Sequence, residues 1–208
     1  MSEINDKRRL GVFGGSFDPI HHGHLIMAES FRESMKLESV IFLPAYVSPF
    51  KTEKAPTSDK HRLEMLRLAI CGNGCFRLDD REIRRGGVSY TVDSLRAMHE
   101  ESPNAELYML IGSDSLIGFD RWREPGAVLS LANIVIARRG GFGNIAWDDL
   151  AKVASPDQLR SIQGRVLDVP LIEMASRDIR LRVKEGRSIR YMVPAAVEAY
   201  IREHHLWL

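Results

Sequence analysis

Cysteine is scarce in this sequence, and long apolar runs are absent. Cys71 and Cys75 are its only two cysteines. Two cysteines cannot form a disulfide framework, and without a second pair they do not match the ligand pattern of a zinc site. No apolar run reaches the ~18 residues of a membrane span, and the N-terminal residues do not resemble a signal peptide. These absences predict reduced cysteines and a cytoplasmic protein that does not contact a membrane.

A strong net charge is lacking too. The chain carries 29 basic and 28 acidic residues, which gives a formal net charge of +1 at pH 7. This balance argues against a dedicated nucleic-acid-binding protein but permits a locally basic pocket. The 208 residues, 44% of them apolar and 27% charged, are typical of one medium-sized globular domain. A chain of this length needs neither disulfides nor a structural metal, and it is compatible with a homo-oligomer.

Short apolar runs alternate with segments of helical periodicity. The predicted strands are Leu10–Phe13, Val40–Leu43, Phe76–Leu78, Leu107–Ile111 and Ile134–Ala137. The predicted helices are Leu25–Met35, Val92–His99 and Arg62–Ile70, the last with Leu63, Leu66 and Ile70 as its apolar positions. Such alternation predicts a doubly wound parallel sheet with helices on both faces. Right-handed crossovers then place the carboxyl end of every strand at one edge, where ligands bind.

Two loops and a tail complete this organisation. Pro44–Ser58 is a long polar stretch with three prolines, and a loop of that length in a compact domain is usually functional. Gly140–Trp147 is rich in glycine and predicted to be a flexible loop. Beyond it the tail shows helical patterns at Ile179–Val183 and Ala195–Ile201. We therefore predict an α/β domain over residues 1–175 and a small helical part over residues 176–208.

The segment Gly14–His24 (GGSFDPIHHGH) combines a strand end, a turn and a helix start. Gly14 and Gly15 permit a tight turn and a close approach of the backbone to a ligand. The helix that begins near the histidines offers free N–H groups and the positive end of its dipole. Such a helix start is an anion site, and phosphate is its usual ligand.

His21 and His24 are three residues apart in this segment. On a first helical turn they lie on one face and can converge on one group. A metal site would need a third ligand, and no H-E-x-x-H pattern is present. As hydrogen-bond donors, the imidazoles would stabilise the negative charge of an in-line displacement at phosphorus. Their protonation stays open at this point, because the helix start disfavours imidazolium whereas a phosphate favours it.

This segment resembles the signature of the class I nucleotidyltransferase superfamily. The resemblance to one of its families, the bacterial nicotinate-mononucleotide adenylyltransferases, extends over nearly the whole chain. It is carried by Ser48–Lys51 (SPFK), Glu82–Leu95 (EIRRGGVSYTVDSL), Ile111–Leu116 (IGSDSL) with Trp122, and the tail from Asp178 to Ile201. It implies a Rossmann-like fold with a small helical C-terminal part. It also implies adenylyl transfer from ATP to nicotinate mononucleotide, which gives nicotinate adenine dinucleotide and pyrophosphate in NAD biosynthesis.

On the ATP side, the resemblance implies that His21 and His24 are catalytic. The residues that it implies for ATP and phosphate binding are Gly14, Gly15, Ser16, Phe17, Lys51, Gly112, Asp114, Arg138, Ser176 and Arg180. Mg²⁺ would arrive with ATP, held mainly by phosphate oxygens and water, so no dedicated metal site is expected in the protein.

The tail departs from the family at its phosphate motif. The sequence reads Met174–Arg180 (MASRDIR) where the family has I-S-S-T-x-I-R. Ala175 therefore lacks a hydroxyl, and Arg177 replaces a small polar residue, where it either contacts phosphate or faces solvent. Ser176 is predicted to be the N-cap of the helix that follows.

On the acceptor side, the resemblance implies that Ser89, Tyr90, Thr91 and Trp122 bind nicotinate mononucleotide. Thr91 is a candidate N-cap of the next helix, and capping alone is the alternative explanation for this strip. Free N–H groups at that helix start would accept a carboxylate and favour the acid over the amide. Trp122 is either a core residue or a stacking partner for the pyridinium ring, to which an indole face adds cation–π attraction.

Other functions remain open at this point. The acceptor could be nicotinamide mononucleotide or phosphopantetheine, although the phosphopantetheine enzymes lack the Ser-Tyr-Thr strip together with the Trp. A cytidylyltransferase would carry a different C-terminal Ser/Thr motif. From another class, the chain could be a nucleotide sensor without catalysis, which loss of either motif histidine would indicate. Both histidines are present.

Overall fold

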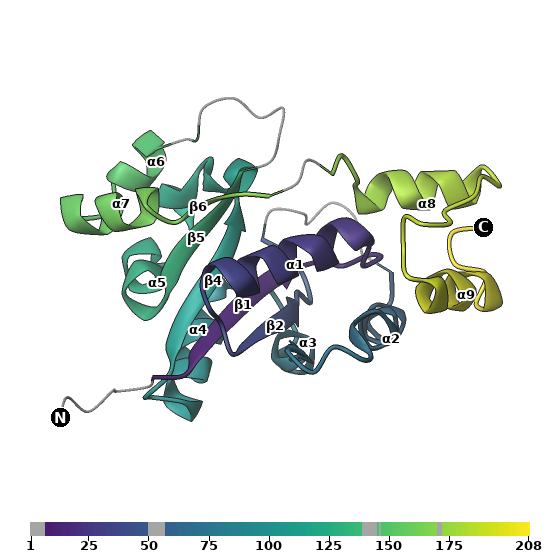
Figure 1. The fold of residues 1–208 in the computed structure, drawn as a ribbon, viewed down its shortest axis with the longest axis horizontal. Helices are drawn as coiled ribbons and strands as arrows, with labels where there is room; N and C mark the ends of the chain where they lie inside the picture. The colour runs from purple at the N-terminus through teal and green to yellow at the C-terminus, as the bar shows by residue number, and fades with distance from the viewer. Residues whose placement is uncertain (1–6, 50–56, 139–144, 146, 170–171) are drawn as a thin grey trace.

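The computed structural model describes residues 7–49, 57–138, 145, 147–169 and 172–208. Within them, six parallel strands form one central sheet (Figure 1). The strands are β1 (Arg9–Gly15), β2 (Ser39–Pro44), β3 (Phe76–Leu78), β4 (Glu106–Gly112), β5 (Asn133–Arg138) and β6 (Val166–Asp168). Their order across the sheet is β3-β2-β1-β4-β5-β6. The winding therefore reverses between β1 and β4, and the carboxyl ends of strands at such a switch point leave a crevice for ligands.

Helices join the strands and extend the chain at its C-terminal end. They are α1 (His22–Ser34), α2 (Asp59–Ile70), α3 (Arg81–Arg85), α4 (Thr91–Glu101), α5 (Pro125–Leu131), α6 (Trp147–Ala151), α7 (Pro156–Gln163), α8 (Ser176–Lys184) and α9 (Ala195–Glu203). Two short 3₁₀ helices, η1 (Ser113–Leu116) and η2 (Phe119–Arg121), follow β4.

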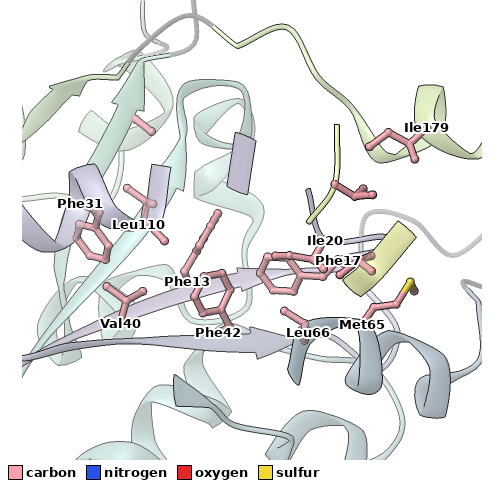
Figure 2. Close-up of a cluster of buried hydrophobic side chains, with 14 of the residues drawn as sticks. Phe13, Phe17, Ile20, Phe31, Val40, Phe42, Met65, Leu66, Leu110 and Ile179 are labelled. Carbon is pink, nitrogen blue, oxygen red and sulfur yellow. The ribbon is translucent and has the colours of Figure 1, made fainter. Parts of the chain in front are cut away.

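The apolar side chains form two hydrophobic clusters, one on each face of the sheet. Phe13 of β1 joins side chains of α1, α2, α8 and α9. Its neighbour Val12 joins side chains of α4, α5, α6 and α7. Adjacent residues of a strand point to opposite faces, so β1 contributes to both clusters. Figure 2 shows the first cluster, in which Phe13, Phe17 and Phe42 lie together.

The predicted doubly wound parallel sheet is confirmed, and each predicted strand is present with ends that differ by at most two residues. Strand β6 and helices α3, α5 and α6 were not predicted, because their segments are short. Helix α7 was missed although it is amphipathic and begins with a Ser155–Gln158 capping box. Of the predicted apolar positions of α2, Leu66 is buried, whereas Leu63 and Ile70 are half-buried. Arg62 and Met65 are its other buried residues.

The tail helices lie at one end of the molecule, where α9 packs against α2 (Figure 1). Ile179 of α8 and Val197 of α9 belong to the same hydrophobic cluster as Phe13. A division of the chain at residue 175 stays a prediction, since this cluster runs across it. In the part of the chain that the structure describes, no helix is long and apolar enough to cross a membrane.

Candidate active site

Strand β1 brings the Gly14–His24 segment to the carboxyl edge of the sheet, next to the end of β4. The turn that follows Gly15 is fixed by Phe17, which has a left-handed φ of 46° and is 1% exposed. The Phe17 ring packs edge-on against Phe13 at 5.5 Å and against His24 at 5.1 Å between centroids. The side chain of Phe17 is therefore part of the core, and only its backbone faces the edge where a nucleotide would bind.

The two motif histidines converge, as predicted. Their rings stack with centroids 3.6 Å apart and an angle of 20° between planes. His21 is the N-cap of α1, and its Nδ1 accepts a hydrogen bond from the backbone N–H of His24. In return, Nδ1 of His24 accepts one from the backbone N–H of His21, both at 3.3 Å. This is a capping box in which imidazoles replace the usual Ser and Glu.

Gly23, between the histidines, makes this stacking possible. A Cβ at Gly23 would lie 3.1 Å from Nδ1 and 3.2 Å from Cε1 of His21, which is tighter than ordinary contact. Any other residue would press on the imidazole that caps the helix. The glycine of the H-x-G-H pattern thus has a steric explanation in this chain.

The capping bonds also assign the protonation of the two rings. A ring nitrogen that accepts a backbone N–H bond carries a lone pair, so the proton of a neutral imidazole then lies on its other nitrogen. Both Nδ1 atoms are acceptors here, so each neutral ring carries its proton on Nε2. The pair can therefore present N–H donors on the side away from the helix backbone. The capping bonds are compatible with neutral imidazoles that donate from Nε2.

The tail helix α8 docks on the loop that precedes the histidines. Ser176 Oγ donates to the Pro19 carbonyl at 2.9 Å, and Arg180 Nη1 donates to the Asp18 carbonyl at 2.5 Å. The predicted N-cap at Ser176 was wrong. Ala175 occupies the cap position without a side-chain hydrogen bond, and Ser176 is the first helical residue. Its hydroxyl is used across the fold instead, because Pro19 and the helix start lie side by side.

Asp18 lies at the junction of these segments and is 5% exposed. Its Oδ2 accepts the backbone N–H of Thr57 at 3.1 Å and lies 3.7 Å from Nη1 of Arg180. Its Oδ1 has no hydrogen-bond partner among the described residues. The Asp18-Pro19 peptide bond is cis. Asp18 thus contacts both the tail helix and the end of the long loop after β2.

Arg62 of α2 is a second junction, and its side chain is fully buried. Its guanidinium donates to the carbonyls of Ser16 at 2.9 Å, Ala45 at 2.7 Å and Thr57 at 3.2 Å, and to Asp59 Oδ1 at 2.5 Å. A buried charge is stable only when such partners satisfy it. Arg62 therefore ties the loop after β1 to both ends of the loop after β2.

Ser89, Tyr90 and Thr91 lie at the start of α4. The predicted N-cap at Thr91 was wrong: Tyr90 is the cap residue, Thr91 is the first helical residue, and no side chain caps the first turn. Ser89 is buried, and its Oγ accepts the backbone N–H of Tyr46 at 2.9 Å. The hydroxyl of Ser89 thus has a partner within the protein, whereas the helix start has no side-chain cap.

Trp122 lies close to this strip. It is half-buried, and its ring centroid is 4.8 Å from that of Phe119. The next residue, Arg123, covers the Tyr90 ring at 4.6 Å and lies 3.8 Å from the carboxylate of Asp93. The fold therefore brings the two predicted acceptor segments, 32 residues apart in sequence between Tyr90 and Trp122, to one neighbourhood.

The remaining predicted residues follow the same edge of the sheet. Gly112 ends β4, Asp114 lies in η1, and Arg138 ends β5 with its Nε 3.3 Å from Asp168 Oδ1. Lys51 and the glycines at 140, 141 and 143 lie outside the described residues. Arg177 has 82% of its side chain exposed and contacts Asp178 at 3.5 Å. In this structure Arg177 faces solvent.

Sequence reasoning missed the junction residues Asp18 and Arg62 and the buried pair Glu82 and Ser94, which hydrogen-bond at 2.6 Å. A signal for Arg62 was available, since it stands three and four residues before Met65 and Leu66 and so shares their helix face. For Asp18, Glu82 and Ser94 no such helix-face pattern exists in the sequence. Their partners come from segments that only the fold brings together.

Comparisons with known proteins agree with this geometry. The family model described as cytidylyltransferase-like matches residues 12–182. Proteins named "Probable nicotinate-nucleotide adenylyltransferase" from Thermomicrobium roseum and Rhodopirellula baltica are 46% and 41% identical to this chain. The alignments cover 96% and 95% of this chain and 91% and 92% of theirs. A nicotinic acid mononucleotide adenylyltransferase of Plasmodium falciparum, solved in complex with NaAD, shares the fold. Its TM-score is 0.75 at 19% identity, with 96% of this chain and 97% of that chain covered.

The family match and the sequence relatives each span most of the chain. The chain belongs to the nicotinate-nucleotide adenylyltransferases, a family of nucleotidyltransferases.

Proposed function

We propose that this protein transfers the adenylyl group of ATP to the phosphate of nicotinate mononucleotide. The products are nicotinate adenine dinucleotide and pyrophosphate, a step of NAD biosynthesis. The observation that carries the proposal is the stacked pair of His21 and His24 at the start of α1, at the switch point of the sheet. The names of the sequence relatives support the acceptor.

The reaction is an in-line displacement at phosphorus. An oxygen of the acceptor phosphate attacks the α-phosphorus of ATP, and the bond from that phosphorus to the oxygen bridging to the β-phosphate breaks. Pyrophosphate leaves, and no bond to the protein forms. His21 and His24 donate their Nε2 protons as hydrogen bonds to phosphate oxygens, where charge rises in the transition state. The fixed capping geometry means that the donors need no rearrangement during the step.

The ATP phosphates are held around the backbone of Gly14, Gly15, Ser16 and Phe17. Gly112, Asp114 and Arg138 follow at the ends of the next two strands, and Lys51 is proposed as a further cation from the long loop. The uncapped start of α8 offers backbone N–H groups to the leaving pyrophosphate. Ser176 and Arg180 support this helix start from behind, through their bonds to the Asp18-Pro19 carbonyls. Arg180 could still add charge to the phosphate site without leaving Asp18.

The acceptor is held by the start of α4 and by Trp122. The uncapped first turn at Thr91 suits the carboxylate of nicotinate, because backbone N–H groups and the helix dipole both favour an anion. The half-buried Trp122 indole offers a face to the pyridinium ring, worth about 0.5–2 kcal/mol. Ser89 and Tyr90 shape this site, since the Ser89 hydroxyl is bonded within the protein.

Mg²⁺ is proposed to enter on the triphosphate of ATP. In the described part of the chain, no group of three or more His, Cys, Asp or Glu could hold a metal ion. Asp18 Oδ1 is a buried carboxylate oxygen without a hydrogen-bond partner there, and a hard cation prefers such oxygen ligands. A cation held by phosphate oxygens, water and at most this carboxylate fits these residues, and it would neutralise charge on the leaving pyrophosphate.

A two-substrate assay tests the proposal. Purified protein is mixed with ATP, MgCl₂ and one acceptor at a time, either nicotinate mononucleotide, nicotinamide mononucleotide or phosphopantetheine, and pyrophosphate release is followed. We expect turnover with the acid and much slower turnover with the other two. Faster turnover with phosphopantetheine or the amide would replace the proposed acceptor. ATP binding without turnover of any acceptor would indicate a nucleotide sensor. Cytoplasmic location, a homo-oligomeric state and the absence of nucleic-acid binding remain predictions.

A further inference from the structure

A buried carboxylate, Glu82, lies behind the strip formed by Ser89, Tyr90 and Thr91. The proposed reaction chemistry does not use it. Glu82 of α3 is 5% exposed, and its Oε1 accepts the hydroxyl of Ser94, which is fully buried, at 2.6 Å. The hydroxyl of Ser89 lies close enough to Glu82 to lower the pKa of its carboxyl. On its outer side, Ser94 Oγ lies 3.5 Å from Nη2 of Arg85. Glu82 thus lies between Ser89, the first residue of the Ser-Tyr-Thr strip, and Ser94 in the first turns of α4.

In this cluster the two serine hydroxyls have their protons available to Glu82. Ser89 Oγ accepts the backbone N–H of Tyr46, so its single proton is left for Glu82. Ser94 likewise gives its proton to Glu82 while its oxygen faces Arg85. An ionised carboxylate can accept both hydroxyls on either oxygen, whereas protonation turns one of these acceptor positions into a donor. The cluster is therefore built for a negative charge at Glu82.

The strip that begins at Ser89 has few other restraints on its N-terminal side, where it joins α3. Gly86 and Gly87 connect α3 to Ser89 with φ values of 69° and 71°, and no atom lies within 4 Å of a Cβ built on either. The glycine pair leaves this connection permissive. Ser89 N–H donates to the Val47 carbonyl at 2.9 Å, and Ser89 Oγ accepts the Tyr46 N–H at 2.9 Å, with its proton available to the nearby Glu82. Ser89 is the point at which the strip becomes fixed.

Stability alone does not explain a carboxylate at this position. Burial raises the pKa of Glu82, against the hydrogen bonds from Ser94 and Ser89. A buried charge is often no more stable than an apolar residue of similar volume. Groups that cost stability are common at functional sites, where geometry matters more than folding free energy.

We propose that Glu82 is a positioning residue that sets the affinity of the enzyme for the acceptor and its preference for a carboxylate on the acceptor ring. Glu82 fixes Ser89 on one side and Ser94 on the other, and the uncapped start of α4 lies between them. Backbone N–H groups distinguish a carboxylate from an amide only while their directions are fixed. This inference rests on the proposed function, because it assumes that the acceptor carboxylate lies at Thr91.

The test is Glu82→Gln, which keeps the shape of the side chain but removes its charge and replaces one carboxylate oxygen with an amide N–H₂ donor. Steady-state kinetics are measured with the nicotinate and nicotinamide mononucleotides at saturating ATP, and then with ATP varied. We expect the KM for the nicotinate acceptor to rise about 10-fold, the effect of one lost bond to a charged group, and the acid-to-amide ratio of kcat/KM to fall. The KM for ATP and kcat should stay within about threefold of wild type.

Glu101→Gln is the matched control, because Glu101 lies at the other end of α4 with 64% of its side chain exposed. It should leave every constant unchanged. Ser94→Ala removes one donor to Glu82 and should shift the acceptor KM in the same direction, which keeps the test decisive if Glu82→Gln does not fold. An unchanged acceptor KM in a folded, active variant overturns the proposal, as does a fall in kcat alone. A wild-type protein that does not turn over nicotinate mononucleotide overturns the proposed function and this inference together.

Discussion

Two substitutions at His24 can separate its catalytic function from its structural one. Nδ1 of His24 accepts the backbone N–H of His21, and its Nε2–H is the proposed donor to phosphate. Asparagine places its amide oxygen near the position of Nδ1 and has nothing at the position of Nε2. Glutamine does the reverse, since its amide nitrogen reaches the position of Nε2 and nothing remains at Nδ1. His24→Asn should therefore keep the cap and lose the donor, and His24→Gln should lose the cap and keep the donor.

The magnitudes follow from these contacts. Loss of one preorganised donor to a developing charge lowers kcat by about 10²–10³-fold, or roughly 2.7–4 kcal/mol. Loss of an N-cap acceptor costs about 0.5–2 kcal/mol of folding free energy. We therefore expect His24→Asn to lose about 10²-fold or more in kcat at nearly unchanged Tm. His24→Gln should retain much more of kcat but melt several degrees lower, about 2–4 °C per kcal/mol for a chain of this size.

The assay is pyrophosphate release at saturating ATP and nicotinate mononucleotide, with thermal unfolding of the same preparations followed by circular dichroism. His24→Ala lacks both groups and should combine the two losses. If His24→Asn keeps kcat within about threefold of wild type, the Nε2–H of His24 does not stabilise the transition state. If both variants lose kcat equally while only their Tm values differ, the effect of His24 on catalysis acts through helix geometry.

Three further predictions concern stability. Arg62→Met leaves the carbonyls of Ser16, Ala45 and Thr57 without their shared donor, so the free energy of unfolding in urea should fall by about 3–5 kcal/mol; a loss under about 1 kcal/mol would show that water replaces the guanidinium. Ala175→Ser supplies the missing N-cap of α8 and should raise the free energy of unfolding by about 0.5–2 kcal/mol, and an unchanged Tm would contradict the cap assignment. For Glu82, burial raises the pKa above its ordinary 4.5 while Arg85 lowers it and Asp79 raises it. The ionised Glu82 therefore lowers the stability of the wild-type protein as the pH rises through the folded-state pKa. The Tm of Glu82→Gln minus that of wild type should increase from pH 4.5 upward, and a constant difference between pH 4 and pH 8 would refute this.

Much of the fold was predictable from sequence because its causes are local. The strands around Val12 and Val135 are buried on both faces and read as continuous apolar runs, and the strand–helix alternation then restricts the topology. The histidine pair was predictable for the same reason, since a spacing of three places both rings at one helix start. Strand β6 was not predictable: it has three residues, and only pairing with β5 makes it a strand.

The candidate site was predictable only where its residues lie close together in the sequence. The N-cap predictions at Thr91 and Ser176 failed for a common reason. Hydroxyl residues near a helix start usually cap it, but here the helices begin one residue earlier than that rule suggests. Both cap positions, Tyr90 and Ala175, lack a capping side chain. No local pattern favours such an arrangement, because an uncapped helix start is less stable in isolation.

The two uncapped helix starts lead to one further step. The start of α4 is held from behind by Glu82 and Ser94, and the start of α8 is held through Ser176 on the Pro19 carbonyl. At α8 the hydroxyl of Ser176 is bonded to the Pro19 carbonyl, and at α4 the cap residue Tyr90 makes no capping bond, so neither helix start has a side-chain cap. One helix start suits the carboxylate of the acceptor and the other suits the departing pyrophosphate. Since His22 N–H also donates to the Met192 carbonyl at 3.0 Å, the tail helices hold the same loop that carries the histidines. The bonds of Ser176 and Arg180 to this loop give these two residues a structural role in the tail motif, whereas Ala175 makes no capping bond and Arg177 faces solvent.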